Sequence, residues 1–427
     1  MTTPTPISIV WFRQDLRLED NPALVEAAKH GVILPVYIVD DTVGAASRWW
    51  LYESLAKLDE SLSHKLHIYQ GDAQEILKSL CERYPVRAVY WNRCYEPWRI
   101  AQDTVIKDDL RKRQLICESF NGSLLWEPWE ILKGDKTNYK VFTPYYQNGC
   151  LKGTAPRKPL SAPSLQLVEK GHQDGWFTSR PWQAKLASHW EVGEKAAQVK
   201  LCEFLENFVQ TYDNDRDFPS LDSTSKLSPH LHFGEISPQQ IWHQVPNKKS
   251  VFLKELVWRE FSYYLLYHFP ELPHKNFQSK FDKFQWEHRT DYLEAWQKGE
   301  TGVPLVDAGM KELWETGYMH NRVRMVAASF LVKNLLIDWR HGARWFWDCL
   351  VDADLANNSA SWQWVAGSGA DAAPYFRIFN PLTQAGRFDA DESYIRRWLG
   401  DRRIKPIVDV KLSRVNALDA YKKLRAE

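Results

Sequence analysis

The chain has 427 residues, enough for two or three domains and more than one buried core. With 44% hydrophobic and 26% charged residues its composition is that of an ordinary globular protein, and a formal net charge of +1 gives no overall attraction to nucleic acid. The six cysteines include no C-x-x-C pair, no stretch approaches about eighteen apolar residues, and the first residues do not form a secretion signal. These features argue against a zinc site, a disulfide framework and a membrane span, and they predict a soluble cytoplasmic protein without a bound metal.

Strand-like and helix-like stretches alternate along the first 130 residues. Short β-rich apolar runs lie at residues 7–12, 32–39, 67–71, 88–92 and 115–120. Helix-like stretches between them cover residues 21–30, 46–64, 72–84 and 98–113. This alternation is typical of a parallel sheet covered on both faces, so we predict a doubly wound α/β domain over residues 1–130. Either Asp20 or Asn21 can cap the helix that begins at Pro22.

The alternation ends after this region. Residues 131–190 are predicted to be an interdomain connector, because residues 152–165 carry three prolines among Gly, Ser and basic residues. From residue 191 to residue 427 the periodicity is helical, which predicts a second, all-α domain. Neither a G-x-G-x-x-G turn nor a P-loop occurs, so a nucleotide held in the usual Gly-rich cradle is not expected.

A hydroxyl-rich loop, TSKLS at residues 224–228, precedes one of the predicted helices. Ser228 and Pro229 suit the N-cap and N1 positions of that helix. Hydroxyl and amide groups at a helix N-terminus can bind phosphate, although plain capping explains the same residues.

The next predicted helix covers residues 252–268. Helical spacing places four residues on one face, Glu255, Trp258, Arg259 and Ser262, and leaves the core face to Leu256, Phe261, Leu265 and Leu266. Glu255 and Arg259 could be an i,i+4 ion pair on a solvated face. The tryptophan between them favours the wall of a cavity instead.

A further helix predicted over residues 318–339 repeats this design, with one face formed by Asn321, Arg324, Met325 and Ala328. A buried arginine requires an anion, and Asp352 and Asp354 are the obvious candidates. They open a segment, residues 351–381, that interleaves polar side chains with indoles and has few aliphatic residues. We therefore predict a cavity that holds a flat, polar ligand.

Several motifs together resemble the DNA photolyase and cryptochrome family, and most of all its class I members that act on cyclobutane pyrimidine dimers. The resemblance rests on VWFRQDLRLEDNPAL at residues 10–24, TSKLS at 224–228, the helix at 252–268, HNRVRM at 320–325 and DADLANNSASWQW at 352–364. It implies an α/β domain followed by an all-α FAD-binding domain over residues 191–427. It also implies a monomeric deoxyribodipyrimidine photo-lyase whose partner is dimer-containing DNA. Light-excited reduced FAD would pass an electron to a dimer flipped out of the duplex.

The resemblance also implies roles for individual residues. FAD would be bound by Tyr212, Thr224, Ser225, Lys226, Leu227, Ser228, Arg259, Asn321, Arg324, Asp352, Ala353, Asp354 and Asn358. Arg324 would pair with Asp352 beside the isoalloxazine, and an asparagine would accept a hydrogen bond from flavin N5–H. The spacing favours Asn358 for that role, with Asn357 as the competing choice.

A second set would meet the lesion and the DNA, namely Arg216, Glu255, Trp258, Asn321, Arg322, Met325 and Trp364. Trp362, Trp339 and Trp286 match the three-tryptophan chain that carries electrons to the flavin in the family. Arg396 and Arg397 are candidates for a basic patch, although a charged helix face explains them as well. The role of His320 stays open.

One departure from the family pattern concerns the second, light-harvesting chromophore. Folate-binding members carry an Asn-Glu pair after a Tyr-Glu dipeptide, whereas this chain has Tyr95-Glu96-Pro97 followed by Trp98-Arg99. The departure favours 8-hydroxy-deazaflavin over methenyltetrahydrofolate as the antenna, with no antenna as the alternative.

Three alternative functions remain at this point. A cryptochrome photoreceptor would share the fold, the flavin and the tryptophan chain, but we expect it to carry a longer C-terminal extension. A 6-4 photoproduct enzyme is disfavoured by Met325 in the HNRVRM motif. A non-photochemical nucleotide-binding or adapter protein would explain residues 1–130 but not the polar, tryptophan-lined faces of the helical region.

Overall fold

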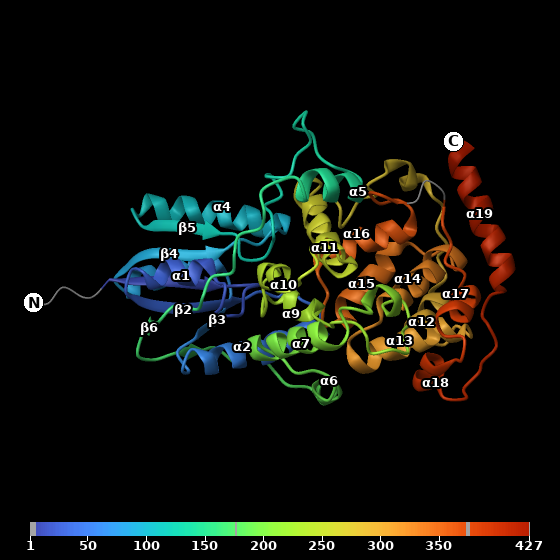
Figure 1. Ribbon diagram of the computed structural model, residues 1–427, viewed down its shortest axis with the longest axis horizontal. Coiled ribbons are helices and arrows are strands. Elements are labelled where there is room, and N and C mark those ends of the chain that lie inside the picture. The colour runs from blue at the N-terminus through green and yellow to red at the C-terminus, as the bar shows by residue number, and fades with distance from the viewer. Residues whose placement is uncertain (1–5, 176, 373–375, 427) are drawn as a thin grey trace, which may run out of the picture.

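The computed structural model describes residues 6–175, 177–372 and 376–426, and it has an α/β domain followed by a larger helical domain (Figure 1). The sheet contains β1 (Ile7–Phe12), β2 (Val32–Val39), β3 (His67–Gln70), β4 (Val86–Asn92), β5 (Ile116–Phe120), β6 (Gln166–Leu167) and β7 (His172–Gln173). Its strand order is β5-β4-β1-β2-β3-β7, with β6 beside β2, and all of these pairings are parallel. The predicted fold class is confirmed.

Helices cover both faces of this sheet, as α1 (Pro22–Ala28), α2 (Ala45–Ser61), α3 (Ala73–Arg83) and α4 (Pro97–Lys112). Successive residues of a strand point to opposite faces. Val10 and Phe12 accordingly pack with α1 and α2, whereas Ile9 and Trp11 pack with α3 and α4. Of the two predicted caps, Asn21 is the one whose side chain accepts from the backbone N–H of Leu24, at the start of α1.

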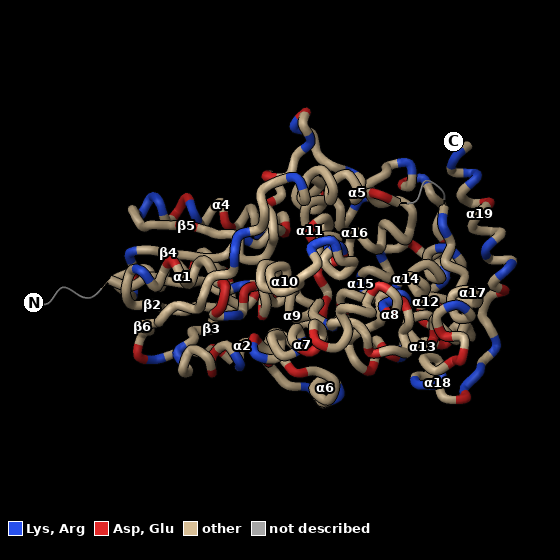
Figure 2. Tube along the Cα trace, in the orientation of Figure 1, with Lys and Arg blue, Asp and Glu red and all other residues tan. Residues whose placement is uncertain are grey.

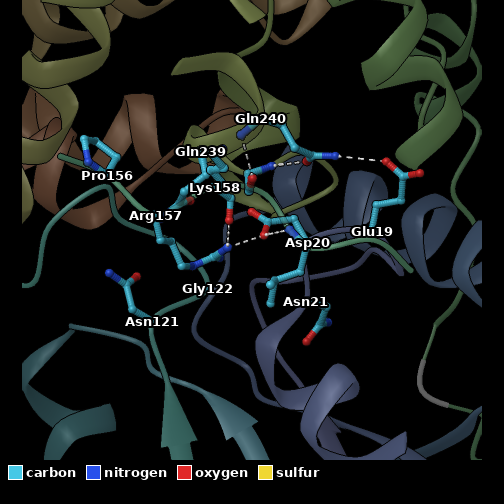
Figure 3. A network of polar contacts seen from close by, with 12 residues as sticks. Glu19, Asp20, Asn21, Asn121, Gly122, Pro156, Arg157, Lys158, Gln239 and Gln240 are labelled. Carbon is cyan, nitrogen blue, oxygen red and sulfur yellow. Dashed lines mark hydrogen bonds and ion pairs between the residues drawn. The ribbon is translucent and has the colours of Figure 1, made fainter. Parts of the chain in front are cut away.

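The residues predicted as a connector return to the sheet. β6 pairs with the start of β2, and β7 pairs with β3. Before these strands, residues 157–160 contact the turn after β1. Asp20 Oδ1 in that turn accepts from Leu160 N at 2.9 Å and forms an ion pair with Arg157 (Figure 3). Asp20 is buried and adopts a left-handed φ of 51°. Part of the predicted connector thus extends the sheet of the α/β domain.

The second domain is helical. In the described part of the chain, no helix is long and apolar enough to span a membrane. The α-helices of this domain are α5 (Phe142–Pro144), α6 (Gln183–Ala187), α7 (Glu194–Asn207), α8 (Tyr212–Asp215), α9 (Ser228–His232), α10 (Pro238–Gln244), α11 (Val251–His268), α12 (Thr290–Lys298), α13 (Pro304–Thr316), α14 (Asn321–Ser329), α15 (Trp339–Cys349), α16 (Leu355–Ala366), α17 (Pro381–Phe388), α18 (Ser393–Leu399) and α19 (Val410–Ala426). α11 agrees closely with the predicted helix at residues 252–268 and is capped by Ser250.

The single helix predicted over residues 318–339 is wrong. α14 ends at Ser329 and passes into a π-helical turn, Phe330–Asn334, after which Leu336 takes a left-handed φ of 52°. α15 then begins at Trp339, with the Asp338 side chain accepting from Arg340 N as its N-cap. The break divides the predicted helix into two, and it puts Trp339 at the start of the second.

The cap predicted at Ser228 is also wrong. Ser228 is the first residue of α9, after Leu227. Its hydroxyl donates instead to Asp352 Oδ2 at 2.6 Å. This contact ties the hydroxyl-rich loop to the aspartate segment before α16.

Candidate functional site

A cavity of about 380 Å³ lies in the helical domain, with walls from α8, α9, α11, α14 and α16 and from the loops before α9 and α16. Most of the predicted site residues line it, namely Tyr212, Ser225, Leu227, Ser228, Glu255, Trp258, Arg259, Asn321, Arg324, Met325, Asp352, Ala353, Asp354, Asn358 and Trp362. The remaining ones are outside its lining, namely Thr224, Lys226, Arg216, Arg322, Trp364, Trp339 and Trp286.

An ion pair between Arg324 and Asp352 crosses one wall of the cavity. Arg324 Nη2 lies 2.8 Å from Asp352 Oδ2, while Arg324 Nε donates to Met319 O at 2.7 Å. Burial opposes the charge of Arg324, but the neighbouring Asp352 carboxylate outweighs it and raises the arginine pKa. The second oxygen, Asp352 Oδ1, is buried and has no hydrogen-bond partner among the described residues. A buried acceptor of this kind is costly unless a ligand or water satisfies it.

Asp354 caps α16 and fixes its first turn. Its Oδ1 accepts from Asn357 N at 2.8 Å and from Asn357 Nδ2 at 2.7 Å, and Tyr263 donates its hydroxyl to Oδ2. Burial disfavours the ionised form, but the neighbouring His232, whose Nδ1 lies 3.6 Å from Oδ2, together with Arg259 and Tyr263, lowers the pKa of Asp354 to about 2. The carboxylate therefore stays ionised and keeps the Asn357 amide occupied.

Asn358 has a similar arrangement with a different partner. Its Nδ2 donates to the carbonyl of Ala343 on α15 at 3.0 Å, which holds the amide in one orientation. The carbonyl oxygen of the same side chain has no hydrogen-bond partner within the described residues, and Asn358 lines the cavity. Asn357 also lines the cavity and also uses only its Nδ2, so the choice of Asn358 as the acceptor stays a prediction.

α11 contributes charged and aromatic side chains to the opposite wall. Glu255 and Arg259 line the cavity, as favoured over the alternative of an i,i+4 pair. Each has another partner, since Glu255 Oε1 lies 2.6 Å from Arg216 Nη1 and Arg259 Nη1 donates to Ser123 O at 2.9 Å. Ser262 was predicted on this face, but it is buried and its hydroxyl donates to Trp258 O. Leu256, predicted for the core, is buried in a core cluster and also lines the cavity.

The two tryptophans predicted to face the lesion have different surroundings. Trp258 lines the cavity, and one face of its ring stacks on Phe142 with centroids 3.6 Å apart and planes 8° from parallel. Trp364 is outside the lining, and its indole N–H donates to Asp371 O at 3.1 Å. Only the first of these two rings therefore borders the cavity directly.

The three tryptophans of the predicted electron chain share one hydrophobic cluster. Trp362 borders the cavity and packs so closely over Gly342 of α15 that a Cβ at Gly342 would lie 2.1 Å from Trp362 Cη2. Trp339 begins the same helix and is buried, whereas Trp286 is half-buried at the edge of the cluster. Trp362 thus borders the cavity and Trp286 is the most exposed of the three, while the order of the electron chain stays a prediction.

Three residues near the cavity were missed from the sequence. His232 lines it, Tyr263 holds Asp354, and Phe142 covers Trp258. Tyr263 lies one helical turn after Arg259, so the helical spacing could have indicated it. No local pattern marks the other two, since each depends on a contact between distant segments.

The basic pair on α18 has backbone partners. Arg397 Nη2 donates to Ser220 O at 3.1 Å, and Arg396 donates to Asp391 O. Arg397 thus reaches the segment between α8 and α9, whereas Arg396 stays within its own turn. Their part in a basic patch stays a prediction.

Comparison with known proteins identifies the family. The chain matches "DNA photolyase" over residues 8–164 and "FAD binding domain of DNA photolyase" over residues 252–403. The deoxyribodipyrimidine photo-lyase of Agrobacterium fabrum is 46% identical over 423 residues, which cover 93% of this chain and 88% of the relative. That of Escherichia coli is 37% identical and covers 98% of both. Cryptochrome-2 of Arabidopsis thaliana is 36% identical and covers 92% of this chain and 70% of the relative.

Solved structures agree with these relatives. A bacterial class III photolyase from Agrobacterium tumefaciens superposes with a TM-score of 0.95 at 41% identity, covering 100% of this chain and 99% of the other. An archaeal photolyase from Sulfolobus tokodaii, described with two FAD molecules, gives a TM-score of 0.85 at 29% identity, covering 97% and 99%.

The fold and the cavity define a two-domain protein whose helical domain encloses a ligand site. The chain belongs to the DNA photolyase and cryptochrome family, as the sequence motifs predicted, and it contains the FAD-binding domain of that family. Several relatives carry the name deoxyribodipyrimidine photo-lyase, which confirms the predicted enzyme class. Its assignment to class I stays a prediction, because one similar structure is described as class III.

Proposed function

We propose that this protein repairs cyclobutane pyrimidine dimers in DNA by light-driven electron transfer from FAD. The observation that carries the proposal is that one cavity is lined by two chemically different sets of side chains. One set offers a paired arginine and an amide acceptor, which suit a flavin. The other offers a carboxylate and an indole, which suit an everted pair of pyrimidines.

The residues present fit FAD. Arg324 supplies a positive charge beside the cavity, and Asp352 Oδ1 is a buried acceptor without a partner in the described chain. Ser225 and Ser228 line the same space at the start of α9 and offer hydroxyl groups to a diphosphate. Reduced FAD, when bound and excited by light, supplies the electron that splits the dimer.

The chain's own residues then have separable tasks. Arg324 stabilises negative charge on the ring system, and Asn358, anchored through Nδ2, presents its carbonyl oxygen to a ring N–H. Trp362, Trp339 and Trp286 would return a lost electron from the surface. Their shared cluster, with Trp362 at the cavity and Trp286 partly exposed, supports this route.

The lesion would enter from the α11 side. Photochemical repair enzymes flip their target out of the duplex, and a damaged step costs less to unstack than an intact one. Trp258, backed by Phe142, offers a flat apolar face for the everted bases. Glu255, Asn321 and Met325 line the same part of the cavity and would set the fit to the dimer. We propose Arg216 and Arg322 as partners of the DNA phosphates.

A second chromophore belongs to the proposal as well. We propose 8-hydroxy-deazaflavin rather than methenyltetrahydrofolate as the antenna, on the strength of Trp98-Arg99 after Tyr95-Glu96-Pro97. The absorption spectrum of the purified protein distinguishes the two, since each adds its own near-ultraviolet or blue band to that of the flavin.

Repair of defined lesions tests the function. Chemically reduced protein is illuminated with blue light in the presence of oligonucleotides that carry either a cyclobutane dimer or a 6-4 photoproduct. We expect the dimer to be restored in the light and not in the dark, and the 6-4 lesion to be left intact. Bound flavin without repair of either lesion would indicate a photoreceptor, and repair of the 6-4 lesion alone would overturn the substrate assignment.

A further inference from the structure

Four alternating charges form a chain at the edge of the cavity, beginning on α11 and ending on α14. Glu255 Oε1, in the cavity wall, lies 2.6 Å from Arg216 Nη1. Arg216 Nε in turn lies 3.9 Å from Asp217 Oδ1, and Asp217 Oδ2 lies 2.6 Å from Arg322 Nη2. Arg216 and Asp217 directly follow α8 in the sequence. Figure 2 shows basic and acidic residues side by side around this helix.

Asp217 is the carboxylate that both arginines share. Arg216 also lies over the ring of Tyr212 at 5.4 Å, and Arg322 lies over the ring of Phe388 at 4.5 Å. In each contact the guanidinium carbon lies over the ring, so the rings help to hold the two guanidinium groups beside Asp217, closely for Arg322 and at the margin of ion-pair distance for Arg216. The two arginine side chains are 18% and 17% exposed, so a phosphate group can reach them without unfolding of the site.

We infer that Asp217 is a positioning residue that makes DNA binding depend on the lesion. The inference rests on the proposed function, because it takes Arg216 and Arg322 as the phosphate partners. Phosphates carry no sequence or damage information by themselves, so two free guanidinium groups bind intact and damaged DNA alike. By holding both groups at one point at the cavity edge, Asp217 keeps them from phosphates spread along a regular duplex.

A phosphate carried to the cavity by an everted dimer is in a different situation. It can replace Asp217 between the two converging arginines, where each guanidinium forms a charge-assisted hydrogen bond with it. When Arg216 turns to the phosphate, Glu255 loses its partner and becomes available to the everted bases. The exchange of partners therefore couples phosphate binding to base recognition. Intact DNA, which has no everted bases, can contact the arginines through its phosphates but gains no contact with Glu255.

The test compares Asp217→Asn with Asp213→Asn, which removes the same charge from an exposed position on α8. Dissociation constants are measured in the dark by fluorescence anisotropy, with labelled oligonucleotides that are either intact or carry one cyclobutane dimer, over a series of salt concentrations. For Asp217→Asn we expect affinity for intact DNA to rise about tenfold, which corresponds to about 1.4 kcal/mol, with affinity for the dimer changed less than about threefold. Asp213→Asn should shift both affinities slightly and equally.

Asp217→Glu serves as the conservative variant and should recover most of the discrimination, which loss of local structure alone would not allow. Flavin content and far-ultraviolet circular dichroism confirm that each variant is folded. If Asp217→Asn and Asp213→Asn have the same effect on both oligonucleotides, Asp217 acts only through net charge and the inference is wrong. If the parent protein itself fails to prefer dimer-containing DNA, the proposed function fails, and this result is separate from any effect at Asp217.

Discussion

The two domains bury charged side chains for different purposes. At the carboxyl ends of β1 and β4, Arg13 donates to both oxygens of Asp103, at 2.7 and 3.1 Å, and to Asn92 O at 2.6 Å. Asn92 Nδ2 in turn donates to Asp15 Oδ2 at 2.6 Å, and Trp91 donates its indole N–H to Asp103. Arg13 Nε and Asn92 Oδ1 have no partner among the described residues, but the other polar groups bond to one another, so the edge of the sheet is held together largely by its own polar network.

The helical domain contains a similar ion pair in a different setting. Arg324 and Asp352 are 2.8 Å apart, but they border a cavity, and the Arg324 side chain is 24% exposed whereas that of Arg13 is 4% exposed. Asp352 Oδ1 is also left without a partner among the described residues. A buried network away from the cavity stabilises the fold, whereas one that borders the cavity and can be reached is suited to a ligand. The comparison predicts that replacing Arg13 mainly lowers stability, whereas replacing Arg324 mainly weakens ligand binding.

The largest effect is expected for Arg13→Ala. Removing one member of a buried ion pair leaves an uncompensated charge and typically costs about 3–5 kcal/mol. The free energy of unfolding should therefore fall by about this amount in urea titrations, while the flavin affinity of the folded fraction stays unchanged. Arg48→Ala is the matched control, since Arg48 forms an exposed pair with Asp41 in the same domain and should cost at most about 1 kcal/mol. Equal losses in the two variants would contradict the role given to the sheet edge.

Arg324→Ala should mainly affect the ligand. Loss of a charge-assisted contact should weaken FAD binding about 100-fold, which is about 3 kcal/mol. The free energy of unfolding without FAD should change less than in Arg13→Ala, because water can reach Asp352 from the cavity. Flavin fluorescence during titration of the apoprotein measures the affinity. Arg402→Ala, which breaks an exposed pair with Glu300, should bind FAD like the parent. Unchanged FAD affinity in Arg324→Ala would remove this arginine from the proposed site.

Local patterns in the sequence were sufficient for most of the fold. Each strand from β1 to β5 lies in a short, largely apolar run between turn residues, and such runs can be recognised from the sequence alone. β6 and β7 were missed because two-residue strands have no pattern of their own and exist only through their pairing with β2 and β3. The break before α15 was missed because buried residues continue through it, as at Leu335 and Ile337. Hydrophobic periodicity reports burial and does not report where the backbone turns.

The candidate site likewise contains residues that local patterns predict and residues that they do not. Residues carried by helical spacing or by a family motif reached the cavity, including Glu255, Arg259 and Asn358. The partners that hold them could not be read from the sequence, because they come from remote segments. Phe142 on Trp258 and Ser123 on Arg259 are examples. Sequence patterns therefore identified many of the cavity's own side chains and few of the contacts that orient them.

The smallest of the three effects concerns the pH response of the cavity edge, where three arginines lie near one histidine. His320 caps α14, its Nδ1 accepting from Arg322 N at 3.2 Å. Burial, together with the charges of Arg324, Arg322 and Arg216, outweighs Asp217 and lowers the pKa of His320 to about 4.

Because this imidazole is neutral in the folded state and protonates near pH 6.5 when unfolded, its contribution to stability is complete above that pH and is lost as the pH falls towards 4. Between pH 7 and pH 5 the loss should reach about 2 kcal/mol. His320→Asn keeps a side chain that can cap the helix but does not titrate, so its unfolding free energy should fall by about 2 kcal/mol less over the same interval. Urea titrations of both proteins at pH 7, 6 and 5 measure the difference. Parallel pH profiles would mean that burial and the neighbouring arginines do not lower the pKa of His320 in the folded protein.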